Sequence, residues 1–277
     1  MTSERDVLDP EIILDQLGPS LFSENIIFRK TLDSTNRLAR ELARQGAPEG
    51  SVVLAEKQTA GRGRRGRAWV SPGYRNLLFS LLLRPTLPPH EVFALTMTLA
   101  LAACEAVREM TGLEVLIKWP NDLYVGQKKL AGILTEFALQ GKGIDYVILG
   151  IGLNVNWNPT SSQSTALRLE TGRDISRNDL FVGILQRFEE YYKDVSPGRT
   201  ALYYEKWNAL SLIMGKDVEI EFDQETIQGK ALGIDYDGAL IIRDLKGREK
   251  RIRNGDVTVK WWRERCVHGN EKDPGSG

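Results

Sequence analysis

The sequence predicts an α+β protein followed by a small all-β part. Between residues 26 and 210, short apolar or alternating stretches typical of strands are interspersed with longer segments of helical period. Beyond residue 211 the helical patterns stop, and short strand-like stretches are separated by turns such as residues 235–238 (Asp-Tyr-Asp-Gly). A length of 277 residues and a hydrophobic fraction of 42% allow one large domain and a small one. We therefore expect a short leader over residues 1–25, a main domain over 26–210, a small β-barrel over 211–265 and a disordered tail over 266–277.

The individual elements follow from periodicity and from start and stop signals. Asp9 and Ser176 stand where helix N-caps are needed, and either Asp33 or Ser34 can cap a third helix. Helices are predicted over residues 10–17, 37–45, 90–109, 165–171, 178–194 and 199–209. Strands are predicted over residues 26–30, 51–56, 76–84, 115–118, 123–125, 128–137 and 146–153, and in the C-terminal part over 216–222, 225–234, 240–244 and 250–253.

Composition excludes several classes of protein. Lys plus Arg and Asp plus Glu each number 37, so the net charge is zero and the whole chain has no electrostatic case for binding nucleic acid. The two cysteines, Cys104 and Cys266, make no disulfide framework and fit a reducing cytosol. The acidic first residues do not form a signal peptide, and we expect no apolar run long enough to span a bilayer. With only His90 and His268 in the chain, acid–base catalysis by histidine is not expected.

Residues 58–69 are the most informative stretch. Gly61, Gly63 and Gly66 alternate with arginines, and the stretch ends on Trp69. Glycines let a backbone approach a ligand closely, arginines suit phosphate and carboxylate oxygens, and a tryptophan can stack on a flat ring. An Arg/Gly run can also be a disordered segment that grips nucleic acid. Because this run is short and lies between two strand-like stretches, it predicts a mobile active-site loop that closes over an anion with an attached base.

Three other groups of residues are candidates for a site. Residues 34–36 (Ser-Thr-Asn) begin a helix, so capping alone can explain them, although a helix N-terminus also offers N–H groups to a polar ligand. Lysines next to loops are usually solvated, but Lys118 and Lys129 flank a Trp-Pro-Asn-Asp turn. Gly150 and Gly152 lie inside a predicted strand, where glycine indicates that something approaches closely. Their spacing does not match the dinucleotide-binding fingerprint, so a Rossmann fold is rejected.

Three sequence blocks, in order, resemble biotin protein ligases. They are residues 55–67, with the Gly-Arg-Gly-Arg-Arg-Gly-Arg run; residues 118–133, with Lys-Trp-Pro-Asn-Asp and Lys-Lys-Leu-Ala-Gly-Ile; and residues 150–154 (Gly-Ile-Gly-Leu-Asn). With their surroundings they cover residues 26 to 253. The resemblance implies a class II synthetase-like domain, with a mixed, mostly antiparallel sheet packed with helices, and an SH3-like C-terminal β-barrel. It implies that ATP and Mg²⁺ activate biotin to biotinyl-5′-AMP, and that biotin passes to a lysine of a biotin carboxyl carrier domain.

The resemblance also implies the roles of individual residues. Arg64 would hold the mixed anhydride, Lys129 would meet the biotin carboxylate and the α-phosphate, and Lys118 completes the catalytic set. Asp122 matches the metal-side position. The biotin-binding positions are Ser34, Thr35, Asn36, Gln58, Arg62, Gly63, Arg64, Lys129, Gly132, Ile133 and Leu134. The ATP-binding positions are Arg62, Arg64, Arg67, Trp69, Lys118, Asn121, Gly150, Gly152 and Asn154.

Some ligases of this kind carry an N-terminal winged helix that binds DNA. Residues 1–25 are too short for such a domain, so we expect a cytoplasmic ligase without DNA or membrane partners. The expected partner is the carrier protein of acetyl-CoA carboxylase or of another biotin-dependent carboxylase, and a homodimer is plausible. Three alternatives stay open: a lipoate ligase or octanoyl transferase, a nucleic-acid-binding module, and a biotin sensor without chemistry.

Overall fold

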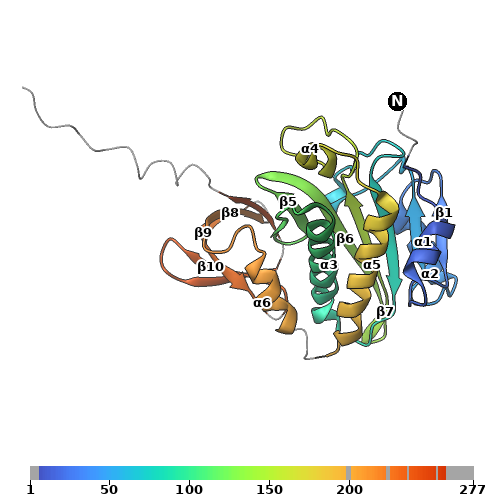
Figure 1. Cartoon of the computed structure of the whole chain (residues 1–277). Helices are drawn as coiled ribbons and strands as arrows, with labels where there is room; N and C mark the ends of the chain where they lie inside the picture. The colour runs from blue at the N-terminus through green and yellow to red at the C-terminus, as the bar shows by residue number, and fades with distance from the viewer. Residues whose placement is uncertain (1–5, 198–200, 223–224, 236, 254, 260–277) are drawn as a thin grey trace, which may run out of the picture. The chain divides into compact units, whose positions relative to one another are not determined.

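The computed structural model describes residues 6–197, 201–222, 225–235, 237–253 and 255–259, and the chain forms two compact units (Figure 1). The first unit comprises residues 1–212 with 236–238, and the second comprises residues 213–235 with 239–277. Residues 266–277, which were expected to form a tail and which include Cys266 and His268, lie outside the described residues.

The first unit is built on a seven-stranded sheet in the order β1-β2-β3-β7-β6-β5-β4. The pair β1–β2 is parallel and every other neighbouring pair is antiparallel, which confirms the expected mixed, mostly antiparallel sheet. A parallel pair needs a crossover connection, and α2 (Thr35–Arg44) supplies it. The strands are β1 (Ile26–Arg29), β2 (Val52–Ala55), β3 (Leu77–Leu83), β4 (Leu116–Lys118), β5 (Asp122–Val125), β6 (Lys128–Gln140) and β7 (Gly143–Leu153).

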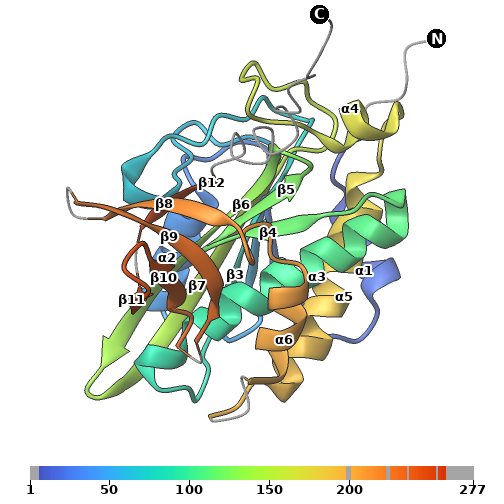
Figure 2. The ribbon, with the colours of Figure 1, turned by 90° about the vertical axis from the view of Figure 1, so that its left-hand side faces the viewer.

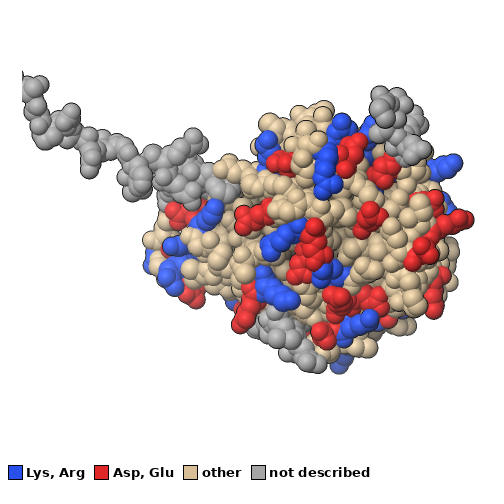
Figure 3. All heavy atoms as spheres, in the orientation of Figure 1, with Lys and Arg blue, Asp and Glu red and all other residues tan. Residues whose placement is uncertain are grey.

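Helices α3 (Phe93–Thr111) and α5 (Arg177–Asp194) lie side by side on one face of the sheet (Figure 2). All seven residues of β3 are buried, and its Phe79 ring meets Phe181 of α5 edge to face at 4.9 Å between centroids. The helix α1 (Pro10–Leu17) packs on α5, and α6 (Ala201–Ala209) packs on α3. The short elements are α4 (Leu167–Thr171) and the 3₁₀ turns η1 (Arg64–Gly66) and η2 (Pro89–Glu91). On the side shown in Figure 3, acidic and basic side chains are interspersed, as zero net charge implies.

Several local predictions are confirmed and one is corrected. Asp9 and Ser176 accept hydrogen bonds from the first turns of α1 and α5, and Cys104 is buried in α3. Contrary to expectation, the segment 89–111 is long and apolar enough to cross a membrane by length and composition. It is apolar on most sides because α3 packs against both the sheet and a second helix, and 83% of its most apolar 18 residues are buried in the structure.

Helix α2 packs on the opposite face of the sheet and covers only part of it. Ala39 and Ala43 pack on a cluster that includes Val53, Leu82 and Ile148 of the central strands. The N-terminus of α2 lies farther along these strands, beside Ser80 of β3 and Leu134 of β6. Beyond this point the face of the sheet is left to loops, and the candidate site lies there.

The second unit is a five-stranded antiparallel sheet in the order β11-β10-β9-β8-β12. The four expected strands are present as β8 (Asp217–Phe222), β9 (Glu225–Ile234), β10 (Leu240–Asp244) and β11 (Glu249–Ile252). The sequence-based prediction missed β12 (Asp256–Val259), a run of four residues that pairs with β8. Buried Val257 and Val259 alternate with Thr258, a pattern of two apolar residues that is too short to predict a strand by itself.

The contact between Phe79 and Phe181 gives a direct test of the packing of α5 on the sheet. Phe181→Ala should lower the free energy of unfolding by about 3–5 kcal/mol, because it removes a buried ring and leaves a cavity. Urea unfolding followed by circular dichroism measures this. Val70→Ala is the control: Val70 is 70% exposed, so its loss should change stability by less than about 0.5 kcal/mol. Equal effects of the two substitutions would contradict the packing described here.

Candidate active site

Three glycines on neighbouring strands form the floor of the site. Gly132 of β6 pairs with Gly152 of β7, and strand alternation puts Gly150 on the same face as Gly152. A Cβ atom at Gly150 would overlap the side chain of Asn36, and one at Gly152 would lie 2.5 Å from the indole of Trp69. A Cβ at Gly132 would lie 3.3 Å from Asp122 and from the Lys129 ammonium. Glycine is therefore required at positions 150 and 152, where side chains from elsewhere lie directly on the sheet, while at Gly132 an added Cβ would only be a tight contact. This is the close approach that the sequence predicted.

The start of α2 is not capped by its own serine. Ser34 occupies the N-cap position, but its hydroxyl makes no capping hydrogen bond. Gln58, which follows β2, instead accepts from the Thr35 backbone N–H at 2.7 Å and from the Thr35 hydroxyl at 3.1 Å. Because the amide oxygen of Gln58 is used in this way, its NH₂ group is the part of the side chain that can donate to a ligand. Capping alone thus does not account for Ser34, and the structure brings residues 34–36 together with Gln58 as expected.

A polar chain runs beneath the start of α2. Ser80 of β3 donates to the Asn36 amide oxygen at 2.7 Å and lies 2.8 Å from the Thr35 hydroxyl. The NH₂ group of Asn36 donates to Glu136 at 2.8 Å and to the Leu134 carbonyl at 3.2 Å. Since a carboxylate only accepts, Glu136 fixes the orientation of the Asn36 amide. Sequence reasoning missed Ser80 and Glu136, and the only signal for Ser80 is a single polar residue in an otherwise apolar strand.

The Arg/Gly loop folds back on itself as a small hairpin. Gly63 N–H donates to the Arg67 carbonyl at 2.7 Å, and Trp69 N–H donates to the Gly61 carbonyl at 2.9 Å. The turn at its tip places Arg65 at φ 54°, in the left-handed region. The base of the hairpin brings Trp69 onto Gly152, so the loop reaches the floor of the site. From the hairpin, Arg64 donates to the side-chain oxygen of Asn121 at 3.4 Å.

The two lysines and the aspartate of the second sequence block lie together, as predicted. Lys118 on β4 pairs in register with Asp122 on β5, which pairs in register with Gly132. The Lys129 ammonium lies 2.7 Å from the Asp122 carboxylate and 5.7 Å from the centroid of the Trp69 ring. These contacts hold a positive charge above the glycine floor, beside the indole.

Lys118 is supported by a tyrosine that the sequence did not indicate. Its ammonium lies 3.4 Å from the Tyr124 hydroxyl and 5.2 Å from the centre of that ring. Burial, and then the charge of Asp122, raise the pKa of Tyr124 to about 12. Tyr124 is therefore a neutral phenol at physiological pH, and its oxygen can accept from Lys118.

Two predicted site residues lie differently from the rest. Ile133 alternates with Gly132 and Leu134, so its side chain lies on the face covered by α3, where the next residue on that face, Thr135, meets Thr96 at 2.7 Å. Its side chain therefore does not line the face that carries the glycine floor. Asn154 is 4% exposed, and its amide bonds to Asn76 and to the Thr165 carbonyl.

The acidic residues fit a metal carried by phosphates better than a metal held by the protein alone. Within the described ranges, no group of three or more His, Cys, Asp or Glu residues gathers into a metal-binding cluster. Asp122 supplies one carboxylate beside two lysines. Mg²⁺ is typically held by one or two carboxylates together with substrate phosphates and water, so a single aspartate fits that mode. Cys104 takes no part, because burial raises the pKa of its thiol far above the ordinary value.

Two protein-family models match parts of this chain. Residues 28–154 match the Biotin/lipoate A/B protein ligase family, and residues 213–260 match the Biotin protein ligase C terminal domain. The Bifunctional ligase/repressor BirA of Bacillus subtilis is 36% identical over 250 residues, covering 88% of this chain and 76% of BirA. The biotin–(acetyl-CoA-carboxylase) ligase of Mycobacterium tuberculosis is 32% identical over 267 residues, covering 91% of this chain and 96% of the relative.

Among solved structures, a biotin protein ligase from Aquifex aeolicus in complex with biotin and ATP superposes with a TM-score of 0.72 at 32% identity. The superposition covers 86% of this chain and 99% of that chain. The glycine floor, the arginine hairpin and the paired lysines thus belong to a chain that resembles these relatives over most of its length. This protein is a member of the biotin protein ligase family.

Proposed function

We propose that this protein is an ATP-dependent ligase that converts biotin to biotinyl-5′-AMP and then transfers biotin to a lysine of a biotin carboxyl carrier domain. The observation that carries the proposal is the meeting of three parts on one glycine floor: the polar start of α2, the arginine hairpin and the Lys129–Asp122 pair. One part suits a small polar ring, and the other two suit a phosphoanhydride.

The ureido ring of biotin would lie at the start of α2. This ring presents one carbonyl and two N–H groups, so it needs donors and acceptors together. Gln58 offers its NH₂ group, the Ser34 hydroxyl can donate or accept, and the Thr35 hydroxyl oxygen can accept. The thiophane ring and the valeryl chain would lie over Gly132 and Leu134, toward Lys129.

Cations would surround the reacting groups at the other end. In the first step, a carboxylate oxygen of biotin attacks the α-phosphorus of ATP and the bond to the pyrophosphate oxygen breaks. Lys129, Lys118 and Arg64 would stabilise the charge on the carboxylate and on the phosphoryl oxygens. Arg62 and Arg67 of the hairpin would hold phosphates, and Trp69 with Asn121 would border the nucleotide. When bound, Mg²⁺ supplies further neutralisation of phosphate charge, with Asp122 as its carboxylate.

The second step needs a neutral amine and protection from water. The carrier lysine nitrogen attacks the carbonyl of the mixed anhydride, its proton is lost, and AMP leaves. Neither step uses a nucleophile of the enzyme. The mixed anhydride hydrolyses readily, so the hairpin above the floor would exclude water until the acceptor arrives.

The rival activities have less support. The dithiolane ring of lipoate has no N–H or carbonyl groups. It would therefore give no hydrogen-bond partner to the polar cluster of Thr35, Asn36, Ser80 and Gln58. A protein that binds biotin without catalysing a reaction would not need both Lys118 and Lys129 at the site. A nucleic-acid module is not favoured by zero net charge. We also propose a cytoplasmic location, an acceptor such as the carrier protein of acetyl-CoA carboxylase, and assembly as a homodimer.

The first prediction tests the reaction itself. Incubation with biotin, MgATP and a purified biotin carboxyl carrier domain should add the mass of one biotinyl group to a single carrier lysine, as read by mass spectrometry. Pyrophosphate should be released with biotin and MgATP even without the carrier. Lipoate in place of biotin is the control and should give neither signal. Pyrophosphate release with lipoate but not with biotin would refute the proposal.

The second prediction concerns retention of the intermediate. Arg64→Ala should let biotinyl-5′-AMP escape and label lysines on unrelated proteins, because the arginine that grips the anhydride is lost. Release of the adenylate is measured by rapid filtration, and indiscriminate labelling by a streptavidin blot with albumin as bait. Arg65→Asn is the matched control in the same hairpin, since asparagine tolerates the left-handed conformation of Arg65. An Arg64→Ala variant that retains the adenylate tightly and loses only transfer would contradict this role.

The third prediction concerns the glycine floor. Gly150→Ala should displace Asn36 and weaken biotin binding by at least about fivefold, since overlap at this position costs at least about 1 kcal/mol. Isothermal titration with biotin measures it. Gly183→Ala in α5 is the control, because the added Cβ meets only Ala106 at an ordinary 3.7 Å. Unchanged biotin affinity in Gly150→Ala would show that Asn36 and the floor are not part of the biotin site.

A further inference from the structure

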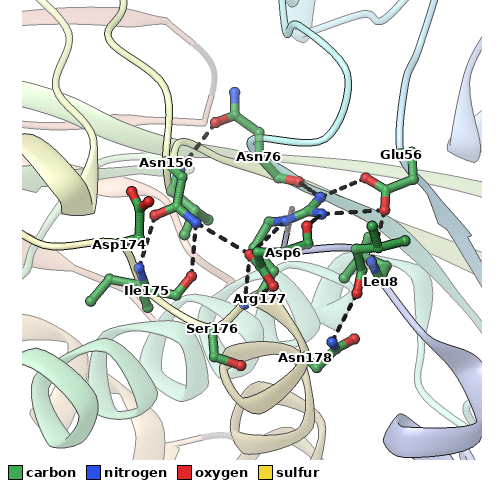
Figure 4. A network of polar contacts seen from close by, with 12 residues as sticks. Asp6, Leu8, Glu56, Asn76, Asn156, Asp174, Ile175, Ser176, Arg177 and Asn178 are labelled. Carbon is green, nitrogen blue, oxygen red and sulfur yellow. Dashed lines mark hydrogen bonds and ion pairs between the residues drawn. The ribbon is translucent and has the colours of Figure 1, made fainter. Parts of the chain in front are cut away.

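A cluster of buried ionic side chains around Arg177 takes no part in the reaction described above (Figure 4). Arg177, the first residue of α5, has a fully buried side chain, and so does Glu56. The guanidinium lies 2.7 Å from the Glu56 carboxylate and 2.9 Å from the carboxylate of Asp6. Charges buried to this degree are retained only when they are paired, so each member of this cluster constrains the others.

The cluster joins the two stems of the arginine loop. Glu56 directly follows β2 and stands two residues before Gln58. Arg177 also donates to the carbonyl of Asn76 at 3.1 Å, and Asn76 directly precedes β3. The loop of residues 57–75 therefore leaves the sheet beside one partner of Arg177 and returns to it beside another. A backbone bond from Tyr74 to the Glu56 carbonyl, at 3.3 Å, closes the stems.

The same network continues toward Lys129. Asn76 donates to the side-chain oxygen of Asn154 at 3.2 Å, and Asn154 donates to the Thr165 carbonyl at 3.0 Å. Thr165 N–H then bonds to the backbone carbonyl of Lys129 at 2.9 Å. A shift of Arg177 would therefore change the position of both the arginine loop and the start of β6, the strand that carries Lys129.

The segment before α1 completes the cluster. Asp6 accepts from the Arg177 backbone N–H at 3.2 Å, and its backbone carbonyl accepts from the guanidinium. It also accepts from Asn156 at 3.2 Å. Leu8 N–H donates to the Glu56 carboxylate at 2.8 Å. Residues 6–8 therefore supply an anion and a donor that Arg177 and Glu56 need in the interior.

We propose that Arg177 is a positioning residue that, together with Asp6 and Glu56, sets how firmly the arginine loop is held over the glycine floor, so that residues 6–8 control retention of the activated intermediate. The part that concerns the intermediate rests on the proposed function. The part that concerns the loop does not depend on any ligand.

The experiment uses Asp6→Ala in the full chain, because Arg177→Lys would leave two carboxylates poorly paired in the interior and is expected to unfold the protein. Trypsin tests the loop directly, since Arg62, Arg64, Arg65 and Arg67 are cleavage sites. Without any ligand, Asp6→Ala should raise the rate of cleavage at these four sites by at least roughly tenfold, because the carboxylate that accepts from the Arg177 guanidinium, the Arg177 backbone N–H and Asn156 is lost. With biotin and MgATP, release of biotinyl-5′-AMP should rise by a similar factor. Asp6→Asn, which keeps an acceptor for Arg177, should lie between Asp6→Ala and the parent protein.

Asp145→Ala is the matched control. Asp145 pairs with Arg84 at 3.0 Å, and Arg84 directly follows β3 at the end away from the loop and also binds backbone carbonyls. Because this pair is about a third exposed, the variant should lose less stability in urea than Asp6→Ala, and it should leave loop cleavage and adenylate release unchanged. If Asp6→Ala and Asp145→Ala behave alike in both assays, the cluster only stabilises the fold and the proposal is overturned. If neither the parent protein nor any variant forms an adenylate, the proposed function is wrong. The trypsin assay then still decides whether the cluster positions the loop.

Discussion

The absence of three Cβ atoms on β6 and β7 is the constraint on which the site depends. Side chains normally stand between a sheet and anything that packs on it. At Gly132, Gly150 and Gly152 that layer is missing, so Asn36, Trp69 and Lys129 can lie directly on the backbone of the sheet. These three residues come from a helix, a loop and a strand edge that are far apart in the sequence. The floor is thus what makes a single site out of separate segments.

The order of the strands explains why these segments meet. The sheet begins with a parallel pair, β1 and β2, and the crossover between them puts the start of α2 beside the loop that follows β2. Antiparallel pairing of β7 with both β3 and β6 then places Ser80 and Leu134 on either side of Gly150. The polar start of α2 lies above these residues. The register of the central strands therefore decides which side chains can face a ligand.

Much of this architecture could be predicted from local patterns. The periods of the helices and strands and the caps at Asp9 and Ser176 predicted the elements correctly, and the internal glycines correctly indicated a close approach. Each of these signals depends on residues that are close in sequence. Ser80, Glu136 and Arg177 could not be recognised in this way. Each is a polar residue whose role depends on a partner at least 44 positions away, such as Asn36 for Ser80 and Glu56 for Arg177. The strand β12 escaped prediction because four residues carry too little period, and its pairing with β8 is non-local.

The hydroxyl contacts beneath α2 have a consequence for ligand choice. The hydroxyl groups of Ser80 and Thr35 have two hydrogens between them, but three contacts need a hydroxyl hydrogen. These contacts are Ser80 to Asn36, Ser80 to Thr35 and Thr35 to Gln58. The Asn36 and Gln58 atoms in these contacts are amide oxygens, which bring no hydrogen of their own. One hydrogen must be shared between two contacts, so hydrogen-bond acceptors outnumber the available hydroxyl donors beneath α2. A ligand with N–H groups, such as a cyclic urea, supplies the missing hydrogen-bond donors. A ligand that only accepts hydrogen bonds would leave still more acceptors without a donor.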